Sequence, residues 1–193
     1  FESSKTFDKT ITLKRHIVDL EDVHRQAKEQ KLKIILKGYF QRSEYFIPYK
    51  QDIKKWFNID EGLRTSLLKK YDIKNNDVIL HSRLGDYVTL GYVINPFHIK
   101  EIINNVLADD GKLFIVTDEI NSIYHQFFKE YKPTILSNSD KEDFYLMTCF
   151  KNIVMSQSSF SWWASFFASE DSNIYYPKTK NFGQWGIESK KEI

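Results

Sequence analysis

The sequence predicts an α/β fold, built on a Rossmann-like parallel sheet with helices on both faces. From about Tyr71 onward, short apolar runs alternate with longer amphipathic stretches, which is the rhythm of successive βα units. Each apolar run is bounded by Asp, Asn, Gly, Ser or Pro residues that favour turns. A chain of 193 residues, of which 41% are hydrophobic, can bury one substantial core. Right-handed crossovers between the strands would then complete the layered fold.

Apolar, turn-bounded segments are predicted as strands and the amphipathic stretches between them as helices. The predicted strands are Val78–Arg83, Leu113–Thr117, Thr134–Ser137, Ile153–Ser156 and Ile174–Tyr176. The predicted helices are Phe97–Leu107, Ile120–Tyr131, Lys141–Phe150 and Ser159–Ser169. Asp140, followed three residues later by Asp143, resembles a capping arrangement at the start of the third helix.

The first 70 residues are less regular. Their expected elements are a strand at Thr10–Leu13, a helix at Leu20–Gln30, a strand at Lys33–Leu36 and helices at Gln51–Phe57 and Leu63–Lys70. This pattern is typical of the end of a preceding structure rather than of a complete domain. We therefore predict a partial N-terminal region and connector over residues 1–70 and a Rossmann-like ligand-binding domain over residues 71–193.

The balance of charge argues against nucleic-acid binding, because 28 basic and 26 acidic side chains leave a net charge of only +2. Cys149 is the lone cysteine, which excludes an internal disulfide and fits a reducing, cytoplasmic location. The Golgi lumen is the alternative if the chain is part of a type II membrane protein. No apolar run approaches the roughly 18 residues of a membrane span, so no transmembrane segment is expected in this chain.

Several cofactor and metal signatures are absent from the sequence. There is no phosphate loop ending in Lys-Ser/Thr, no Gly-x-Gly-x-x-Gly fingerprint and no Asp-x-Asp pair for a divalent metal beside a nucleotide sugar. The five histidines have no short metal-binding spacing. The sequence therefore favours a metal-free transferase with no cofactor over an ATPase, a dehydrogenase or a metalloenzyme.

The first candidate for chemistry is the segment His81–Tyr87, which reads HSRLGDY and lies where the first strand of the sheet ends. Ligands of open α/β sheets bind beyond the carboxyl ends of strands. His81 and Arg83 project to the same face because side chains alternate along a strand, and Gly85 allows a sharp turn behind them. The fork of Arg83 donors suits a diphosphate. The alternative is an ordinary surface ion pair between Arg83 and Asp86.

The second candidate is the serine-rich segment SQSSFSWW at residues 156–163, which runs from a short strand into a helix. Helix N-termini present unbonded N–H groups and a favourable dipole to anions. The alternative is that a serine there only caps the helix. The third candidate is Asp118 with Glu119, at the end of the second strand and on the same sheet edge. Asp118 could accept from a base or ribose, or could cap the next helix.

These segments resemble, in order, those of the α-1,2-fucosyltransferase family, which has a His-x-Arg-Arg-Gly-Asp-Tyr segment, a strand ending in acidic residues and a Ser-Ser-Phe-Ser-Trp-Trp segment. The resemblance spans roughly residues 38–185, and Leu84 stands where the family has its second Arg. It implies a GT-B-type glycosyltransferase whose C-terminal half binds the donor GDP-fucose, with inversion at the anomeric carbon and no metal. Residues 1–70 would then belong to the acceptor-side half.

Carried over position by position, the resemblance gives each candidate residue a role. Arg83 would bind the β-phosphate and Asp86 would orient Arg83 or its loop, which makes these two the expected catalytic residues. The other expected donor-binding residues are His81, Asp118 and Glu119 near guanosine and Ser158, Ser159 and Ser161 around the phosphates.

The resulting hypothesis is transfer of L-fucose from GDP-fucose to a hydroxyl of a glycan acceptor, a galactoside in α-1,2 linkage. The expected partners are the GDP-sugar donor, the glycan acceptor and other domains of a longer protein, with no nucleic acid. Two alternatives stay open. One is a binding module or partner subunit that keeps the GDP pocket without catalysis, and the other is a transferase that uses another GDP-deoxyhexose.

Overall fold

The computed structural model describes residues 9–14, 19–37 and 43–176 and confirms the α/β architecture. Its strands form two sheets in which every pair of neighbouring strands is parallel. The larger sheet has five strands in the order β5-β4-β3-β6-β7. The chain therefore builds outward from β3 on one side and then crosses to the other side. Such a reversal creates a switch point, here between β3 and β6, where ligands of open sheets bind.

Short apolar segments form the strands of the larger sheet, as the sequence predicts. They are β3 (Val78–Ser82), β4 (Leu113–Thr117), β5 (Thr134–Leu136), β6 (Asn152–Val154) and β7 (Asn173–Tyr175). The helices around this sheet are α2 (Lys50–Phe57), α3 (Glu61–Tyr71), α4 (Gly85–Leu90), α5 (Pro96–Val106), α6 (Asp140–Thr148) and α7 (Ser159–Phe167). The described residues also form the 3-10 helices η1 (Ser43–Tyr45), η2 (Ile47–Tyr49) and η3 (Ile123–Tyr131).

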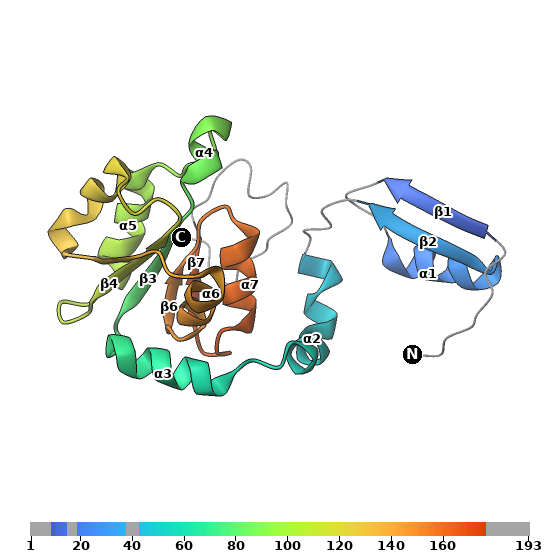
Figure 1. Ribbon diagram of the computed structural model, residues 1–193, viewed down its shortest axis with the longest axis horizontal. Coiled ribbons are helices and arrows are strands. Elements are labelled where there is room, and N and C mark those ends of the chain that lie inside the picture. Colours follow the sequence, from blue (N-terminus) through green and yellow to red (C-terminus); the bar gives the residue numbers. More distant parts are fainter. Residues whose placement is uncertain (1–8, 15–18, 38–42, 177–193) are drawn as a thin grey trace.

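The larger sheet is buried on both faces, and alternate residues of each strand serve opposite faces. In β3, Ile79 belongs to a core cluster with Leu67 of α3, Leu146 of α6 and Ala164 of α7. Its neighbour Leu80 belongs to a second cluster, on the side of α5 and η3. Figure 1 shows these helices on the two sides of the strands. The helices on both faces are confirmed.

The register of the strands brings their carboxyl ends together. His81 pairs with Val116 and Ser82 with Thr117 across β3 and β4, while Leu80 pairs with Val154 of β6. The residues that follow these strands therefore share one edge of the sheet. This carboxyl edge lies on the side of α4 (Figure 1).

Residues 85–131 differ from the predicted elements in two places. The segment from Gly85 was predicted as a turn, but it forms the short helix α4, which ends at Gly91 with a left-handed φ of 69°. The predicted helix Ile120–Tyr131 is the 3-10 helix η3. It begins only at Ile123, because Ser122 accepts from the Tyr124 N–H and so sets its start.

The start of α6 also differs from the capping arrangement predicted for Asp140 and Asp143. Ser139 is the N-cap and accepts from the Glu142 N–H at 3.3 Å. Asp143 is buried and accepts instead from the backbone and side chain of Asn138, which precedes the helix. The phase of the helix explains the difference, because it turns Asp143 inward while Asp140 stays exposed.

The N-terminal elements form a small βαβ unit with a sheet of its own. The strands β1 (Lys9–Lys14) and β2 (Leu32–Lys37) pair in parallel and are joined by α1 (Leu20–Glu29), which Asp19 caps. Figure 1 shows this unit beside the larger one. Leu67 of α3 already belongs to the core of the larger unit, and the domain boundary between residues 70 and 71 stays a prediction.

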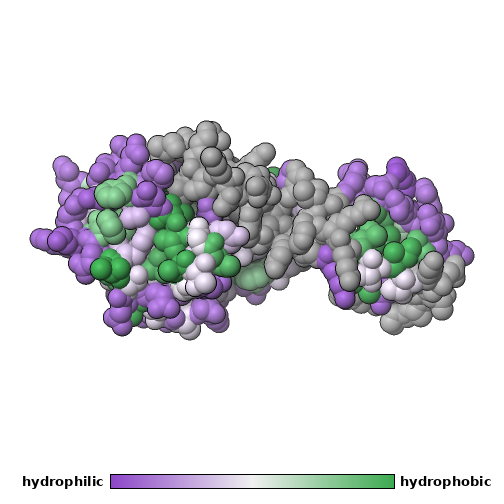
Figure 2. Space-filling view, turned by 90° about the horizontal axis from the view of Figure 1, so that it is seen from above, coloured by the Kyte–Doolittle hydropathy of each residue, from purple (hydrophilic) through white to green (hydrophobic). Residues whose placement is uncertain are grey.

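Apolar side chains also reach the surface on the side of α4. Figure 2, seen from above Figure 1, shows hydrophobic residues among hydrophilic ones on this side of the larger unit. Val88 and Leu90 of α4, Phe97 of α5 and Ile123 of η3 are all more than half exposed. No helix of the described residues has both the length and the apolar character to cross a membrane.

Candidate functional site

A pocket of about 160 Å³ lies at the carboxyl edge of the larger sheet. Its walls come from the ends of β3, β4 and β5 and from the starts of α6 and α7, which lie far apart in the sequence. Among the residues that line it are His81, Arg83, Asp118, Asn138, Ser158 and Phe160. The structure thus brings members of all three predicted segments to one pocket. Asp86, Glu119, Ser159 and Ser161 do not line it.

The Arg83 guanidinium is held by two carboxylates. Its Nε and Nη2 donate to Oδ1 of Asp86 at 3.1 and 2.8 Å, and its Nη1 lies 3.1 Å from Oδ2 of Asp118. The surface pair considered in the sequence analysis therefore forms, within a larger arrangement. The Arg83 side chain remains 40% exposed, so the guanidinium is oriented and still accessible from the pocket.

Asp118 connects β4 to the loop that follows β3. Its Oδ1 accepts from the backbone N–H of Leu84 at 2.8 Å, and its Oδ2 faces Arg83. Gly85 permits this contact, because a Cβ at that position would lie 2.8 Å from Asp118 Oδ2. Asp118 does not cap the next helix, a role that Ser122 takes. Glu119 is exposed and does not line the pocket.

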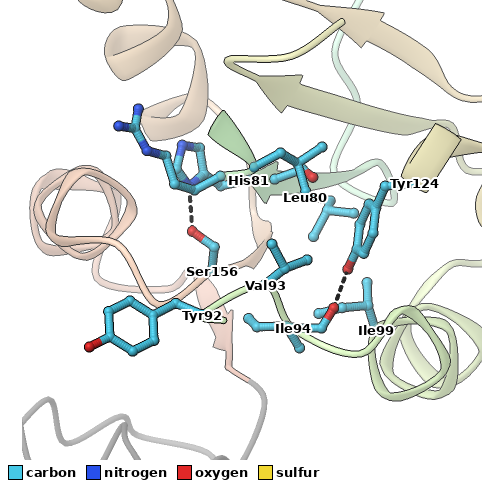
Figure 3. A pocket seen from close by; sticks show the side chains of 11 residues that line it. Leu80, His81, Tyr92, Val93, Ile94, Ile99, Tyr124 and Ser156 are labelled. Atoms are coloured by element: carbon cyan, nitrogen blue, oxygen red, sulfur yellow. Dashed lines mark hydrogen bonds between the residues drawn. The ribbon is translucent and has the colours of Figure 1, made fainter. Parts of the chain in front are cut away.

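His81 is a buried, neutral side chain that links β3 to the loop before α7. Its Nδ1 lies 2.7 Å from Ser156 Oγ, a hydrogen bond drawn in Figure 3. Its ring stacks on Phe160 with centroids 5.3 Å apart. Burial lowers the His81 pKa from 6.5 to about 4, helped by the positive charge of Arg83 and opposed by Asp118. The ring is therefore uncharged at neutral pH.

The three predicted serines lie in different environments at the start of α7. Ser158 lines the pocket and is also the N-cap, since its Oγ accepts from the Phe160 N–H at 3.2 Å. Ser159 is exposed but is not part of the pocket wall. Ser161 is fully buried and donates to the carbonyls of Ser156 and Ser158 at 3.2 and 3.0 Å. The Ser161 hydroxyl is committed to the backbone, and the structure does not bring it into the pocket.

Sequence reasoning missed the side of the pocket formed by β5 and α6. Asn138 lines the pocket and is fixed by Asp143, whose Oδ1 accepts from Asn138 Nδ2 at 2.7 Å and whose Oδ2 accepts from the Asn138 N–H at 3.0 Å. Burial raises the pKa of the Asp143 carboxyl. Asn138 could have been found from its position, because it directly follows the predicted strand Thr134–Ser137 in the same way as Asp118 follows Leu113–Thr117.

A second, smaller cavity of about 10 Å³ lies beside the first, and Figure 3 shows its lining. It has room for about one water molecule. Leu84 lines it and is only 2% exposed. Ser82 Oγ is buried here without a hydrogen-bond partner among the described residues. The position that carries a second Arg in the resembled family is thus apolar and buried in this chain.

In the described part of the chain, no group of three or more His, Cys, Asp or Glu side chains is arranged to hold a metal ion. The pocket itself combines one guanidinium with the carboxylates of Asp118, Asp140 and Asp143. Arg83 therefore suits an anion, and the side formed by Asn138 and Asp140 suits groups that donate hydrogen bonds.

The model of the family described as glycosyl transferase family 11 matches residues 5–190. Among curated proteins, the chain is similar to an alpha-1,2-colitosyltransferase of Escherichia coli, with 28% identity over 169 residues that cover 75% of this chain and 55% of that protein. It is also similar to the O-antigen biosynthesis glycosyltransferase WbnK of Escherichia coli, with 26% identity over 161 residues that cover 73% and 53%. The chain spans about half the length of these relatives.

Proposed function

Since this chain belongs to glycosyl transferase family 11, we propose that its larger unit binds the nucleotide-sugar donor of a glycosyltransferase. The donor is GDP-fucose, and the complete enzyme transfers L-fucose to a hydroxyl of a glycan, in α-1,2 linkage, with inversion and without a metal ion. One observation carries the proposal. Arg83 and Ser158, the latter at the N-terminus of α7, line the same pocket although 75 residues separate them in the chain.

The diphosphate is assigned to the wall formed by Arg83 and the α7 N-terminus. A guanidinium matches two phosphate oxygens, and a helix N-terminus adds backbone N–H groups and its dipole. Negative charge grows on the departing GDP as the bond to the sugar breaks, and these groups stabilise that charge. Because Asp86 binds two guanidinium nitrogens of Arg83, its role is to orient Arg83.

The guanosine is assigned to the wall formed by Asn138 and Asp140, beyond the ends of β4 and β5. Guanine and ribose both present hydrogen-bond donors, and carboxylate and amide oxygens accept from them. Asp118 fits a different role from guanosine binding, since its two oxygens already contact the Leu84 N–H and Arg83.

Replacing Arg83 with Ala tests this function. We expect kcat for fucose transfer to fall by about 100- to 1000-fold, the loss that follows removal of one preorganised donor to a developing oxyanion, and GDP binding to weaken. Fucose transfer to a galactoside and calorimetric titration with GDP measure the two effects. Lys112→Ala is the matched control, because Lys112 is a cation at the opposite end of β4, in contact with Asp72. Wild-type turnover by Arg83→Ala would refute the proposal.

A GDP-linked colitose is the second candidate donor. It is favoured by the similarity to a protein named alpha-1,2-colitosyltransferase and by the apolar Leu84 beside Arg83. The same transfer assay with both donors decides between them by the ratio of kcat/KM. Binding of GDP with transfer of neither sugar would instead indicate a non-catalytic binding module.

A further inference from the structure

Tyr87 of α4 joins the two parts of the anion-binding wall, and the chemistry proposed above gives it no role. On one side its ring lies under the Arg83 guanidinium, with Cζ 5.7 Å from the ring centroid. This separation is within the roughly 6 Å at which a cation is attracted to an aromatic face. On the other side its hydroxyl donates to the carbonyl of Gln157 at 2.9 Å.

The second contact matters because Gln157 directly precedes Ser158, the N-cap of α7. A hydrogen bond to the Gln157 carbonyl therefore fixes the loop from which the α7 N–H groups project. Burial raises the pKa of the Tyr87 hydroxyl, so it keeps the proton that it donates. The Tyr87 side chain thus contacts both the guanidinium and the start of α7. These two groups follow different strands, since Arg83 comes after β3 and α7 comes after β6.

The fold also holds the Tyr87 ring in place. The helix α4 ends at Gly91, and the backbone N–H of Tyr92 donates to the carbonyl of Tyr87 at 3.0 Å. The ring of Tyr92 then packs edge-on against that of Tyr87, with centroids 5.7 Å apart and an interplanar angle of 85°. Tyr87 therefore contacts Arg83, Tyr92 and Gln157.

We propose that Tyr87 is a positioning residue that makes Arg83 and the α7 N-terminus a single preorganised anion site. Tyr87 is not among the residues that line the pocket, so it acts through Arg83 and the α7 N-terminus. Its effect is to fix the spacing between the two sets of donors, and such preorganisation is what makes donors effective in catalysis. The inference rests on the proposed function insofar as the bound anion is the diphosphate of the donor.

The first test reads the geometry without any ligand. The Nε–H resonance of Arg83 in 15N-labelled protein is identified by its loss in Arg83→Lys. In the wild type it carries a ring-current shift from Tyr87, which Tyr87→Leu removes and Tyr87→Phe keeps. An Arg83 resonance that is the same in the wild type and in Tyr87→Leu overturns the inference, provided that both proteins show the same fold by circular dichroism.

The second test is a double-mutant cycle on GDP affinity. Tyr87→Phe removes only the hydroxyl, and we expect it to weaken GDP binding by roughly 3- to 10-fold, the range for one lost hydrogen bond. In the Arg83→Lys background the same change has a smaller effect, because the two groups act together. An equal effect in both backgrounds, or none in the wild type, overturns the inference.

Two controls complete the cycle. Tyr131→Phe removes a tyrosine hydroxyl that donates to Asn104, outside the residues that line the pocket, and leaves GDP affinity unchanged. If the wild type binds neither GDP nor inorganic pyrophosphate, the proposed function fails, whereas the Arg83 resonance still decides whether Tyr87 supports the guanidinium. The failures of the two proposals are therefore distinguishable.

Discussion

Asp118 uses its two carboxylate oxygens for two different tasks, one on the Leu84 N–H and one on Arg83. Replacement by Asn would keep an acceptor for the N–H but remove the charge beside the guanidinium. Arg83 in turn donates to Asp86 through Nε and Nη2, the guanidinium nitrogens that do not face Asp118. A Lys in place of Arg83 has no planar fork and could not reproduce both contacts. The orientation of the site therefore depends on a few charged atoms at fixed positions.

His81 makes folding stability depend on pH. In the unfolded chain the imidazole titrates near 6.5, whereas burial lowers its pKa to about 4 in the folded protein. Between these pH values the unfolded state binds more protons than the folded state. The contribution of His81 to the free energy of unfolding is therefore fully present above pH 6.5 and is lost as the pH falls toward 4. At about 1.4 kcal/mol per pKa unit, the loss amounts to about 3 kcal/mol.

Urea unfolding measured between pH 7 and pH 4 checks this expectation. The His81→Asn variant keeps a hydrogen-bonding group for Ser156 but cannot titrate in this range, so its stability should fall less steeply with acid. Following the imidazole C–H shifts by NMR gives the pKa directly. A His81 pKa close to 6.5 would contradict the account.

At the scale of secondary-structure elements, a carboxylate ties β3 to β4 at each end. Asp118 does so at the carboxyl edge. At the amino edge, Asp77 is fully buried and accepts from the backbone N–H groups of Lys74 and Lys112, both at 2.8 Å. At both edges a carboxylate accepts from backbone N–H groups, but the pocket described above lies at the carboxyl edge. The amino edge can therefore be altered to test stability separately from binding.

Replacing Asp77 with Ala leaves two backbone N–H groups without their acceptor. We expect the free energy of unfolding to fall by about 3 to 6 kcal/mol, since each of the two hydrogen bonds to this charged group contributes about 1.5 to 3 kcal/mol. Asp77→Asn retains one good acceptor and should lose less. The urea midpoint measures both variants. GDP affinity, measured at low temperature where the variants remain folded, should not change, and a large loss of affinity would speak against the separation of the two edges.

At the scale of the whole molecule, the sheet is the rigid body on which the pocket depends. Its two core clusters fill both faces with alternate residues of the same strands. The helix α2 is fastened to the end of α7, where Lys54 donates to the carbonyl of Ala168 and Lys50 and Lys54 both pair with Glu170. These lysines lower the pKa of Glu170 to about 2. The connector thus packs onto the same unit as the site.

Ligand binding should be visible as stability of the whole fold. A ligand at 100 times its dissociation constant stabilises by about 2.7 kcal/mol, which raises Tm by roughly 5 to 10 °C for a chain of this size. We expect GDP to give this shift and UDP or ADP at the same concentration to give less. Arg83→Ala should lose most of it. A UDP shift equal to that of GDP would contradict the assignment of guanosine to the wall of Asn138 and Asp140.

The strands of the larger sheet were predictable from the sequence, because apolar periodicity indicates which residues are buried and turn residues indicate where an element ends. The predicted strands of the larger sheet all form, each within two residues of its expected bounds. The short helix α4 was missed, since it buries none of its own residues and so leaves no periodic signal. The 3-10 form of η3 was missed for a related reason, because apolar spacing does not distinguish it from an α-helix.

The sequence by itself determined the parallel sheet, the chain segments that meet at its carboxyl edge, and the resemblance of those segments to a glycosyltransferase family. Only the tertiary structure decided which side chains face the pocket. In the folded protein the Ser161 hydroxyl donates to the backbone, and Asp118 accepts from the Leu84 N–H. Asn138 lines the pocket, and Tyr87 binds the carbonyl of Gln157 beside it. The physical reason is that a side chain's direction and its hydrogen-bond partners depend on helix phase and on residues distant in the chain, which no local pattern encodes.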